Sequence, residues 1–322
     1  MIKLRLSMIG TLLALIGIST LAFAILLSML GSFNIIGLVF MTALFNIGQW
    51  LIAPYLIGAM YKVNEAPKDR YYELYNFVES ISRKTGLKTP KLMIADLPIP
   101  NAFAYGSPIS GPRVAVTKIL LNDLEGEEVE AVLGHELGHL KNRDVQVMMF
   151  ASILPAIFYF IGYSLMSSSA YGGYRRDRES GAGAAMIGLV AMAVYWVLNL
   201  FVMGLSRIRE YYADQFSARN IQDGPRKLSE ALAKISRSAS VLKQQRRWIG
   251  NINGFKALMI SDPDQAEANT LRAAQYLHRD SDLVQSILNR RLTLLDRVTE
   301  LFSTHPNIVK RLQALQGYQQ LR

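Results

Sequence analysis

Two histidines and a glutamate have the spacing of a zinc-binding helix. His135 and His139 are four positions apart in the segment His-Glu-Leu-Gly-His, and Glu136 directly follows the first of them. Residues at i and i+4 lie on one face of an α-helix, so both imidazoles are able to approach one tetrahedral Zn²⁺. Glu136 is then placed to accept a proton from metal-bound water. This pattern predicts a zinc-dependent hydrolase. The alternative is a solvated helix with an ordinary histidine pair.

A catalytic zinc ion needs a third protein ligand beside its open position. The chain contains no cysteine, which excludes thiolate ligands and thiol catalysis. The longer three-histidine motif would place an imidazole at position 145, where this chain has valine. The remaining histidines, His278 and His305, are distant in sequence, and His278 is typical of a structural or solvated residue.

A carboxylate is the better candidate for this third ligand. Glu210 and Asp214 are four positions apart in Ser206-Arg-Ile-Arg-Glu-Tyr-Tyr-Ala-Asp, a segment that we expect to be a second helix. One carboxylate is able to bind zinc while the other orients a ligand histidine through its free ring nitrogen. The alternative is that Glu210 forms an ordinary surface ion pair with Arg207 or Arg209.

Long uncharged runs predict the membrane-spanning helices that must position these residues. No charged residue occurs between Arg5 and Lys62, and further uncharged runs cover 145–174 and 181–206. The first run is too long for one crossing of a hydrocarbon core of ~30 Å, so it must fold back. We predict four spans at about 6–30, 35–61, 145–167 and 184–205. For the first of them, a cleaved signal peptide is the alternative.

The charges that flank these spans predict their orientation. Lysines and arginines border the spans on the side of the N-terminus, whereas the loop 175–179 on the other side has mixed charges. The positive-inside rule therefore places 62–144 and 206–322 in the cytoplasm, as two parts of one domain between the hairpins 1–61 and 145–205. The even number of crossings in 145–205 returns both candidate ligand helices to the same membrane surface. The net charge of +10 then indicates a bilayer rather than nucleic acid as partner, because no nucleic-acid-binding pattern accompanies it.

The two water-facing parts have different patterns. The first predicts a helix over 69–84, short strands over 91–96, 101–105 and 113–117, and the zinc helix, which we expect to be capped by Asn122 or Asp123. The second is mostly helical by pattern. Its basic stretch 237–247 is a candidate lipid contact or a solvated helix surface, and Gly250–Pro263 is a candidate lid. The fold class is a mainly α membrane protein with an α+β cytoplasmic domain that contains a small sheet.

Four sequence elements together resemble the HtpX-type membrane zinc metalloproteases, bacterial inner-membrane relatives of the prenyl-protein protease that processes CaaX proteins. They are His135-Glu-Leu-Gly-His, Arg209-Glu-Tyr-Tyr-Ala-Asp, Asn101-Ala-Phe-Ala and Ser303-Thr-His-Pro. The resemblance covers nearly the whole chain, including the four-span layout. It implies a cytoplasmic gluzincin domain with one zinc ion bound by His135, His139 and Glu210. It also implies Glu136 as the general base and Asp214 as the residue that supports a ligand.

Two further elements are candidates for roles in this chemistry. His305 is a candidate donor to the oxyanion of the tetrahedral intermediate, with support of the fold as the alternative. Asn101, Ala102, Phe103 and Ala104 are candidates for an edge strand that receives the substrate as an added strand, with an ordinary sheet edge as the alternative. An added strand uses backbone hydrogen bonds and would suit unfolded substrates of varied sequence.

The resemblance implies a role in membrane-protein quality control under stress. The expected substrates are misfolded or damaged membrane proteins and unfolded polypeptides, the expected capacity includes self-cleavage, and other membrane quality-control proteases are expected partners. Two other functions stay open: a protease that processes one specific precursor, and a catalytically silent membrane chaperone or adaptor. The presence of His135, Glu136, His139 and Glu210 together favours an active endopeptidase.

Overall fold

The computed structural model describes residues 48, 51–52, 54–55, 57–59, 61–171, 178–244 and 279–320. The chain divides into two compact units, each made of two segments. The first unit contains Met1–Trp50 and Gln146–Leu205, and the second contains Leu51–Val145 and Ser206–Arg322. The predicted span 6–30 lies outside the described residues, as do most of 35–61, the candidate lid 250–263 and His278.

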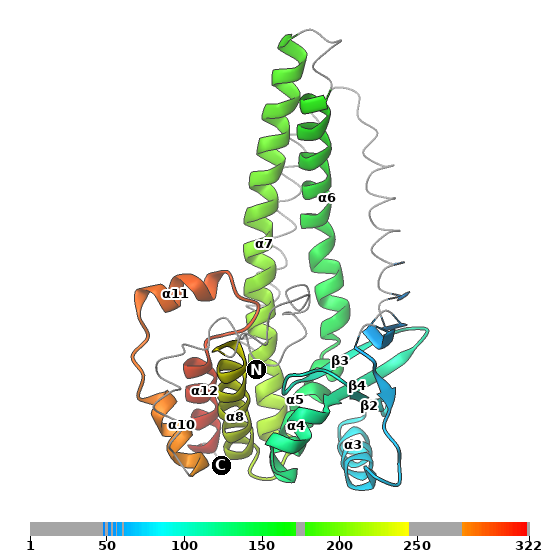
Figure 1. Cartoon of the computed structure of the whole chain (residues 1–322), viewed down its shortest axis with the longest axis vertical. Helices are drawn as coiled ribbons and strands as arrows, with labels where there is room; N and C mark the ends of the chain where they lie inside the picture. The colour runs from blue at the N-terminus through cyan, green and yellow to red at the C-terminus, as the bar shows by residue number, and fades with distance from the viewer. Residues whose placement is uncertain are drawn as a thin grey trace. The chain divides into compact units, whose positions relative to one another are not determined.

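In the first unit, two long helices pack against each other. Helix α6 covers Asp144–Tyr171 and α7 covers Arg178–Asn220, and both continue into the second unit (Figure 1). Their buried side chains form one cluster, which includes Ile157, Phe158 and Leu198. The predicted spans 145–167 and 184–205 are helical. Within the described residues, the segment Gly183–Asn220 of α7 is long and apolar enough to cross a membrane.

The second unit contains a four-stranded mixed sheet in the order β1-β2-β4-β3. Its strands are β1 Asn64–Glu65, β2 Lys91–Ala95, β3 Ala102–Ser107 and β4 Gly111–Thr117. Strands β2 and β4 are parallel, whereas the other two pairs are antiparallel. The three predicted strands are confirmed with small shifts at their ends. Strand β1 was not predicted, because two residues are too few to show an alternating pattern.

Glycines close the hairpin between β3 and β4. Gly106 has φ +152°, and a Cβ there would lie 2.4 Å from the carbonyl oxygen of Gly111, which itself has φ +72°. No side chain fits at Gly106 without moving the backbone of the opposite strand. The sequence Gly-Ser-Pro-Ile-Ser-Gly-Pro is therefore a tight connection between two strands rather than a loop that separates them.

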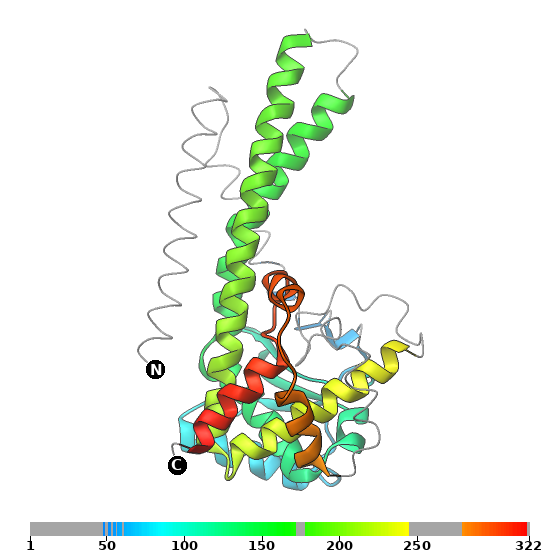
Figure 2. The ribbon, with the colours of Figure 1, turned by 90° about the vertical axis from the view of Figure 1, so that its left-hand side faces the viewer.

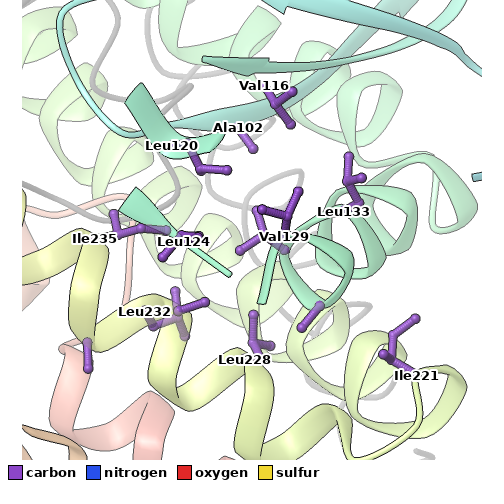
Figure 3. Close-up of a cluster of buried hydrophobic side chains, with 14 of the residues drawn as sticks. Ala102, Val116, Leu120, Leu124, Val129, Leu133, Ile221, Leu228, Leu232 and Ile235 are labelled. Atoms are coloured by element: carbon purple, nitrogen blue, oxygen red, sulfur yellow. The ribbon is translucent and has the colours of Figure 1, made fainter. Parts of the chain in front are cut away.

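Helices cover one face of this sheet and build the main core of the second unit. They are α3 Tyr72–Thr85, α4 Lys118–Asp123, α5 Gly126–Lys141, α8 Gly224–Gln244, α10 Asp280–Leu288 and α12 Ile308–Gln320. The second unit also contains α11 Leu294–Leu301, which contributes no side chain to this core. Figure 3 shows Val116 of the sheet, Leu133 of α5 and Leu232 of α8 in this core. Figure 2 shows α8, α10 and α12 side by side. The other face of the sheet is covered around Tyr61 and Phe103.

The predicted cap of the zinc helix is wrong. Asn122 and Asp123 are the last residues of the short helix α4, which starts where the Thr117 hydroxyl accepts a hydrogen bond from the Leu120 amide. The cap of α5 is Glu125, whose side chain forms a reciprocal capping box with Glu128. A glutamate in this role is hard to recognise, because Ser, Thr, Asp and Asn dominate the cap position.

Candidate active site

A close crossing of α5 and α7 brings the candidate ligands together. A Cβ on Gly138 would lie 3.0 Å from Ala213 Cα and 3.0 Å from Phe216 Cβ, so the two backbones nearly touch at this point. The Ser217 hydroxyl, one helical turn after Ala213 on α7, donates a 2.7 Å hydrogen bond to the Ala131 carbonyl of α5. The glycine inside the His-Glu-Leu-Gly-His segment therefore has a packing role: it allows the helix that carries both histidines to approach the helix that carries Glu210.

The atoms of three predicted ligands converge. His135 Nε2 lies 3.1 Å from His139 Nε2, and Glu210 oxygens lie 3.6 Å and 3.4 Å from these two nitrogens. A tetrahedral zinc ion with bonds of ~2.0–2.1 Å separates its ligand atoms by about 3.3 Å, so these distances fit one ion between them. Glu210 Oε2 is buried and lies 3.4 Å from Arg311 Nη1 as well as 3.6 Å from His135 Nε2, so its charge is balanced even without a metal.

Glu136 lies beside this cluster. One of its carboxylate oxygens and the ligand nitrogens of His135 and His139 all lie within 4.8 Å of one another. Its side chain is buried, and the Ala104 amide of β3 donates a hydrogen bond to its carboxylate. Burial raises the pKa of Glu136, against the opposing charges of the two histidines. A carboxylate with a raised pKa at this position is suited to hold a proton and release it again.

Behind His135, a carboxylate and an arginine fix the ring. His135 Nδ1 lies 2.9 Å from Asp214 Oδ1, so the position predicted for Asp214 is next to a ligand histidine. Arg311 donates two hydrogen bonds to Asp214, from Nε at 2.9 Å and from Nη2 at 2.6 Å. All three side chains are buried. The two hydrogen bonds from Arg311 restrain the Asp214 carboxylate, and the restrained carboxylate orients the His135 imidazole.

A second set of the same kind lies behind His139. His139 Nδ1 is 2.6 Å from Asp144 Oδ2, and Arg209 Nε is 3.3 Å from the same oxygen. Sequence reasoning did not find Asp144, Arg209 or Arg311 in these roles. The position of Asp144, five residues after His139 at the start of α6, was a usable signal, because it lies about one turn from the imidazole.

His305 also reaches the cluster, from the loop before α12. Its Nε2 lies 3.8 Å from Glu210 Oε1, and its Nδ1 is 3.0 Å from the Thr304 hydroxyl. The Ser303 hydroxyl accepts a hydrogen bond from the His305 amide and donates one to the His305 carbonyl, which fixes this loop. The structure thus places His305 beside the Glu210 carboxylate.

Comparisons with known proteins agree with this geometry. The model of the family described as "Peptidase family M48" matches residues 69–319. The chain belongs to peptidase family M48. It is 33% identical to a protease HtpX homolog of Thermoplasma acidophilum, over 94% of this chain and 88% of that protein. It is 35% identical to protease HtpX homolog 2 of Sulfurisphaera tokodaii, over 98% of this chain and 96% of that protein.

A solved structure shares the fold of this M48 peptidase. Ste24p of S. mikatae aligns with a TM-score of 0.52 and 17% identity, over 98% of this chain and 67% of that protein. The predicted resemblance to HtpX-type proteases is therefore confirmed, and with it the prediction of a membrane metalloprotease. An M48 peptidase requires a metal ion, and His135, His139 and Glu210 lie close enough together to offer donor atoms to one.

In the metal-free M48 site, neighbouring charges shift the pKa values of His135 and Glu210. Burial alone would lower the pKa of His135, but the carboxylates of Asp214 and Glu210 outweigh this effect and raise it to about 9. Burial alone would raise the pKa of Glu210, but the positive charges of His305, the two ligand histidines and Arg311 hold it well below its usual range. The site is thus built to keep Glu210 ionised, as a metal ligand must be.

The predicted substrate strand lies at the edge of the sheet. Asn101 and Thr117 exchange hydrogen bonds at the start of the β3–β4 pair, so alternate residues of β3 turn their peptide groups away from β4. These are Ala102, Ala104 and Gly106. Because Ala102 is buried and the other two are partly exposed, the accessible part of this edge begins at Ala104, later than the predicted segment 101–104.

Proposed function

We propose that this membrane metalloprotease is a zinc endopeptidase that hydrolyses peptide bonds of misfolded or damaged membrane proteins. The observation that carries the proposal is the mutual spacing of 3.1–3.6 Å among the two imidazole nitrogens and the Glu210 oxygens, with Glu136 beside them. His135, His139 and Glu210 would hold the ion. When bound, zinc would polarise the scissile carbonyl and lower the pKa of its water.

The side chains around this ion would have separate roles in proton transfer, oxyanion stabilisation and ligand orientation. Glu136 takes a proton from the attacking water and passes it to the leaving amine. His305 donates a hydrogen bond to the developing oxyanion. Asp214 and Asp144 would keep the two imidazoles in the tautomer that presents Nε2 to the metal, because each carboxylate accepts a hydrogen bond from Nδ1–H.

An extended substrate would bind along the exposed edge of β3. Its backbone would pair with outward peptide groups from the Ala104 carbonyl onward, since the Ala104 amide itself donates to Glu136. Such pairing depends little on side chains and therefore suits unfolded segments of many sequences. A protease that processes one precursor would instead need side-chain pockets along this edge.

The surrounding chain would anchor this domain in the cytoplasmic membrane through four spans, at about 6–30, 35–61, 145–167 and 184–205. The charges that flank these spans favour a second unit on the cytoplasmic side. Lipid and unfolded membrane-protein segments are then the immediate partners. Other quality-control proteases would act on the same substrates.

Two substitutions test the proposed chemistry in the full chain purified in detergent. Glu136→Gln should keep bound zinc at the wild-type level and abolish cleavage of casein and of the chain itself, because the base is lost while the ligands remain. Glu210→Ala should lose both zinc and activity. Full zinc content and activity in Glu210→Ala would exclude this carboxylate as the third ligand. Undiminished cleavage by Glu136→Gln would exclude the proposed base.

A further inference from the structure

Helix α11 exposes an apolar face that the second unit leaves uncovered. Leu294, Leu295, Val298, Leu301 and Phe302 are between 51% and 80% exposed. Their spacing of 1, 4, 7 and 8 positions from Leu294 places all five on one side of the helix. Among the described elements, none packs extensively against α11, which Figure 1 shows beside the group of α8, α10 and α12.

Polar contacts on the opposite side fix this outward orientation. Glu300 is buried, where its carboxylate accepts hydrogen bonds from the Lys310 side chain and, at 3.1 Å, from the Asn307 amide. Asp296 caps the helix through the Thr293 amide and pairs with Arg290 at 2.6 Å. The acidic side of α11 is therefore bound to the protein, and the apolar side cannot turn inward without breaking these contacts.

Arg207 ties the end of α11 to α7. Its Nη1 donates to the carbonyls of Glu300 and Ser303, each at 2.7 Å, and to that of Leu301 at 3.2 Å. These are carbonyls at the C-terminal end of α11, where a cation is favoured. Arg207 is two positions beyond residue 205, where the proposed span on the same helix ends. The end of α11 is thus attached to α7 two residues after the proposed span ends.

We propose that α11 is an interfacial membrane helix whose five apolar side chains insert into the lipid surface around the protease. This proposal rests on the proposed span at 184–205. An amphipathic helix with such a face binds between headgroups and acyl chains. Arg291 and Arg297 are exposed beside this face and are able to pair with phosphate groups of the headgroups.

The attachment has a consequence for the active site. Phe302 is the last apolar residue of the face, and His305 follows three positions later in the loop that Ser303 fixes. Lipid that holds α11 would therefore also hold the loop from which His305 approaches Glu210. The bilayer would act as a structural support of this catalytic loop.

Single cysteines test the proposal, since the natural chain has none. Val298→Cys on the apolar face of α11 is labelled with an environment-sensitive fluorophore, and the full chain is placed in lipid nanodiscs with or without nitroxide-labelled lipid. Leu189→Cys, an exposed site in the proposed span, is the positive control, and Asn76→Cys, an exposed site on α3, is the aqueous control. Wild-type zinc content of each labelled variant checks that it has folded.

We expect emission from position 298 to be blue-shifted and quenched by the nitroxide lipid, as at position 189, while position 76 is neither. Emission at 298 that matches position 76 would overturn the proposal. A blue shift without lipid quenching would also overturn it, because another protein segment or a second copy would then cover the face. Absence of quenching at 189 would instead refute the span, so the two failures are distinguishable.

Discussion

Each imidazole that we propose as a metal ligand lies next to a carboxylate, and each carboxylate pairs with an arginine. His135, Asp214 and Arg311 form one set, with Arg311 making two hydrogen bonds. His139, Asp144 and Arg209 form the other, with a single ion pair at 3.3 Å. The two sets differ in strength, since a bidentate contact restrains a carboxylate more than a single one.

Asp144→Asn should weaken zinc binding while the ligands themselves stay in place. Loss of the charge behind His139 makes the imidazole a poorer donor, and outer carboxylates of this kind contribute ~10–100-fold to metal affinity. Competition with a zinc chelator measures the effect. Asp96→Asn is the matched control, because Asp96 forms only an exposed ion pair with Lys118. An affinity for zinc equal to that of the control would show that Asp144 does not support the ligand.

Zinc binding should release a proton near neutral pH. In the metal-free protein the pKa of His135 is raised from 6.5 to about 9, so the ring is protonated at pH 7, whereas a metal ligand must be neutral. The raised pKa stabilises the metal-free fold fully below pH 6.5, and this contribution is lost as the pH rises through about 9. Apparent zinc affinity should therefore increase with pH over the same range.

Calorimetry of zinc binding in buffers with different ionisation enthalpies measures the released proton. The variant His135→Ala lacks this titrating group. Any proton that it still releases on zinc binding therefore comes from other groups. Equal binding enthalpies in all buffers at pH 7 would contradict the prediction.

At the residue scale, sequence reasoning identified the site residues that lie on one helix. It missed the contacts between residues that only tertiary packing brings together. His135, Glu136 and His139 are recognisable because helical geometry alone fixes their relation. Arg209 and Arg311 reach their carboxylates only after α7 and α12 have packed, and no spacing in the sequence encodes that contact. Asp144 lies between these cases, since it is close to His139 in sequence but follows the end of α5.

At the scale of elements, the crossing of α5 and α7 determines the distance between the histidines and Glu210. Gly138→Ala should push the helices apart, because the new methyl group would lie 3.0 Å from both Ala213 Cα and Phe216 Cβ. Overpacking of this kind costs about 1–3 kcal/mol. We expect lower thermal stability together with reduced zinc occupancy, measured by scanning fluorimetry and metal analysis.

Gly126→Ala provides the control on the same helix. A Cβ at Gly126 meets nothing within 4 Å, so this substitution should leave stability and zinc content unchanged or slightly increase stability. Unchanged zinc content in both variants would show that the crossing is not what sets the ligand distance.

The sequence predicted most elements of the second unit but not their ends. Helix α3, strands β2, β3 and β4 and the zinc helix were all expected, because their apolar spacing or turn residues are distinct. Helix α4 was missed, since six residues show no complete amphipathic period. The order of the strands also could not be predicted, because the parallel pairing of β2 with β4 around the β3 hairpin depends on tertiary packing.

At the scale of the whole molecule, the metal would connect distant parts of the chain. Its proposed ligands come from α5 and α7, and the supporting Arg311 comes from α12. A ligand that binds only the folded state stabilises it by RT ln(1 + [L]/Kd), ~2.7 kcal/mol at a hundredfold excess over Kd. Removal of zinc by a chelator should therefore lower the Tm of the second unit.

The two active-site variants separate this effect from other actions of the chelator. Glu136→Gln should show the same loss of Tm as the wild type, because it keeps the ligands. Glu210→Ala should melt at the lower temperature with or without chelator. A chelator effect that persists in Glu210→Ala would mean that the stabilising metal binds elsewhere.

The charge pattern predicted long helices outside the site-bearing segments of the chain. Uncharged runs indicated helices at 145–167 and 184–205, and both segments are helical. Which residues of the second unit face the bilayer was not visible, because the apolar spacing of α11 is equally typical of a core helix. Only the exposure of its apolar side chains in the structure distinguishes the two cases.

The interval of the sequence between His135 and Arg311 has a consequence for biosynthesis. A growing polypeptide that has emerged only as far as residue 205 carries both imidazoles but lacks Glu210, His305 and Arg311. Hydrolytic capacity would then arise only late in translation, after the hairpin of α6 and α7 has been inserted. An unfinished copy would be harmless to neighbouring nascent proteins until its own integration is complete.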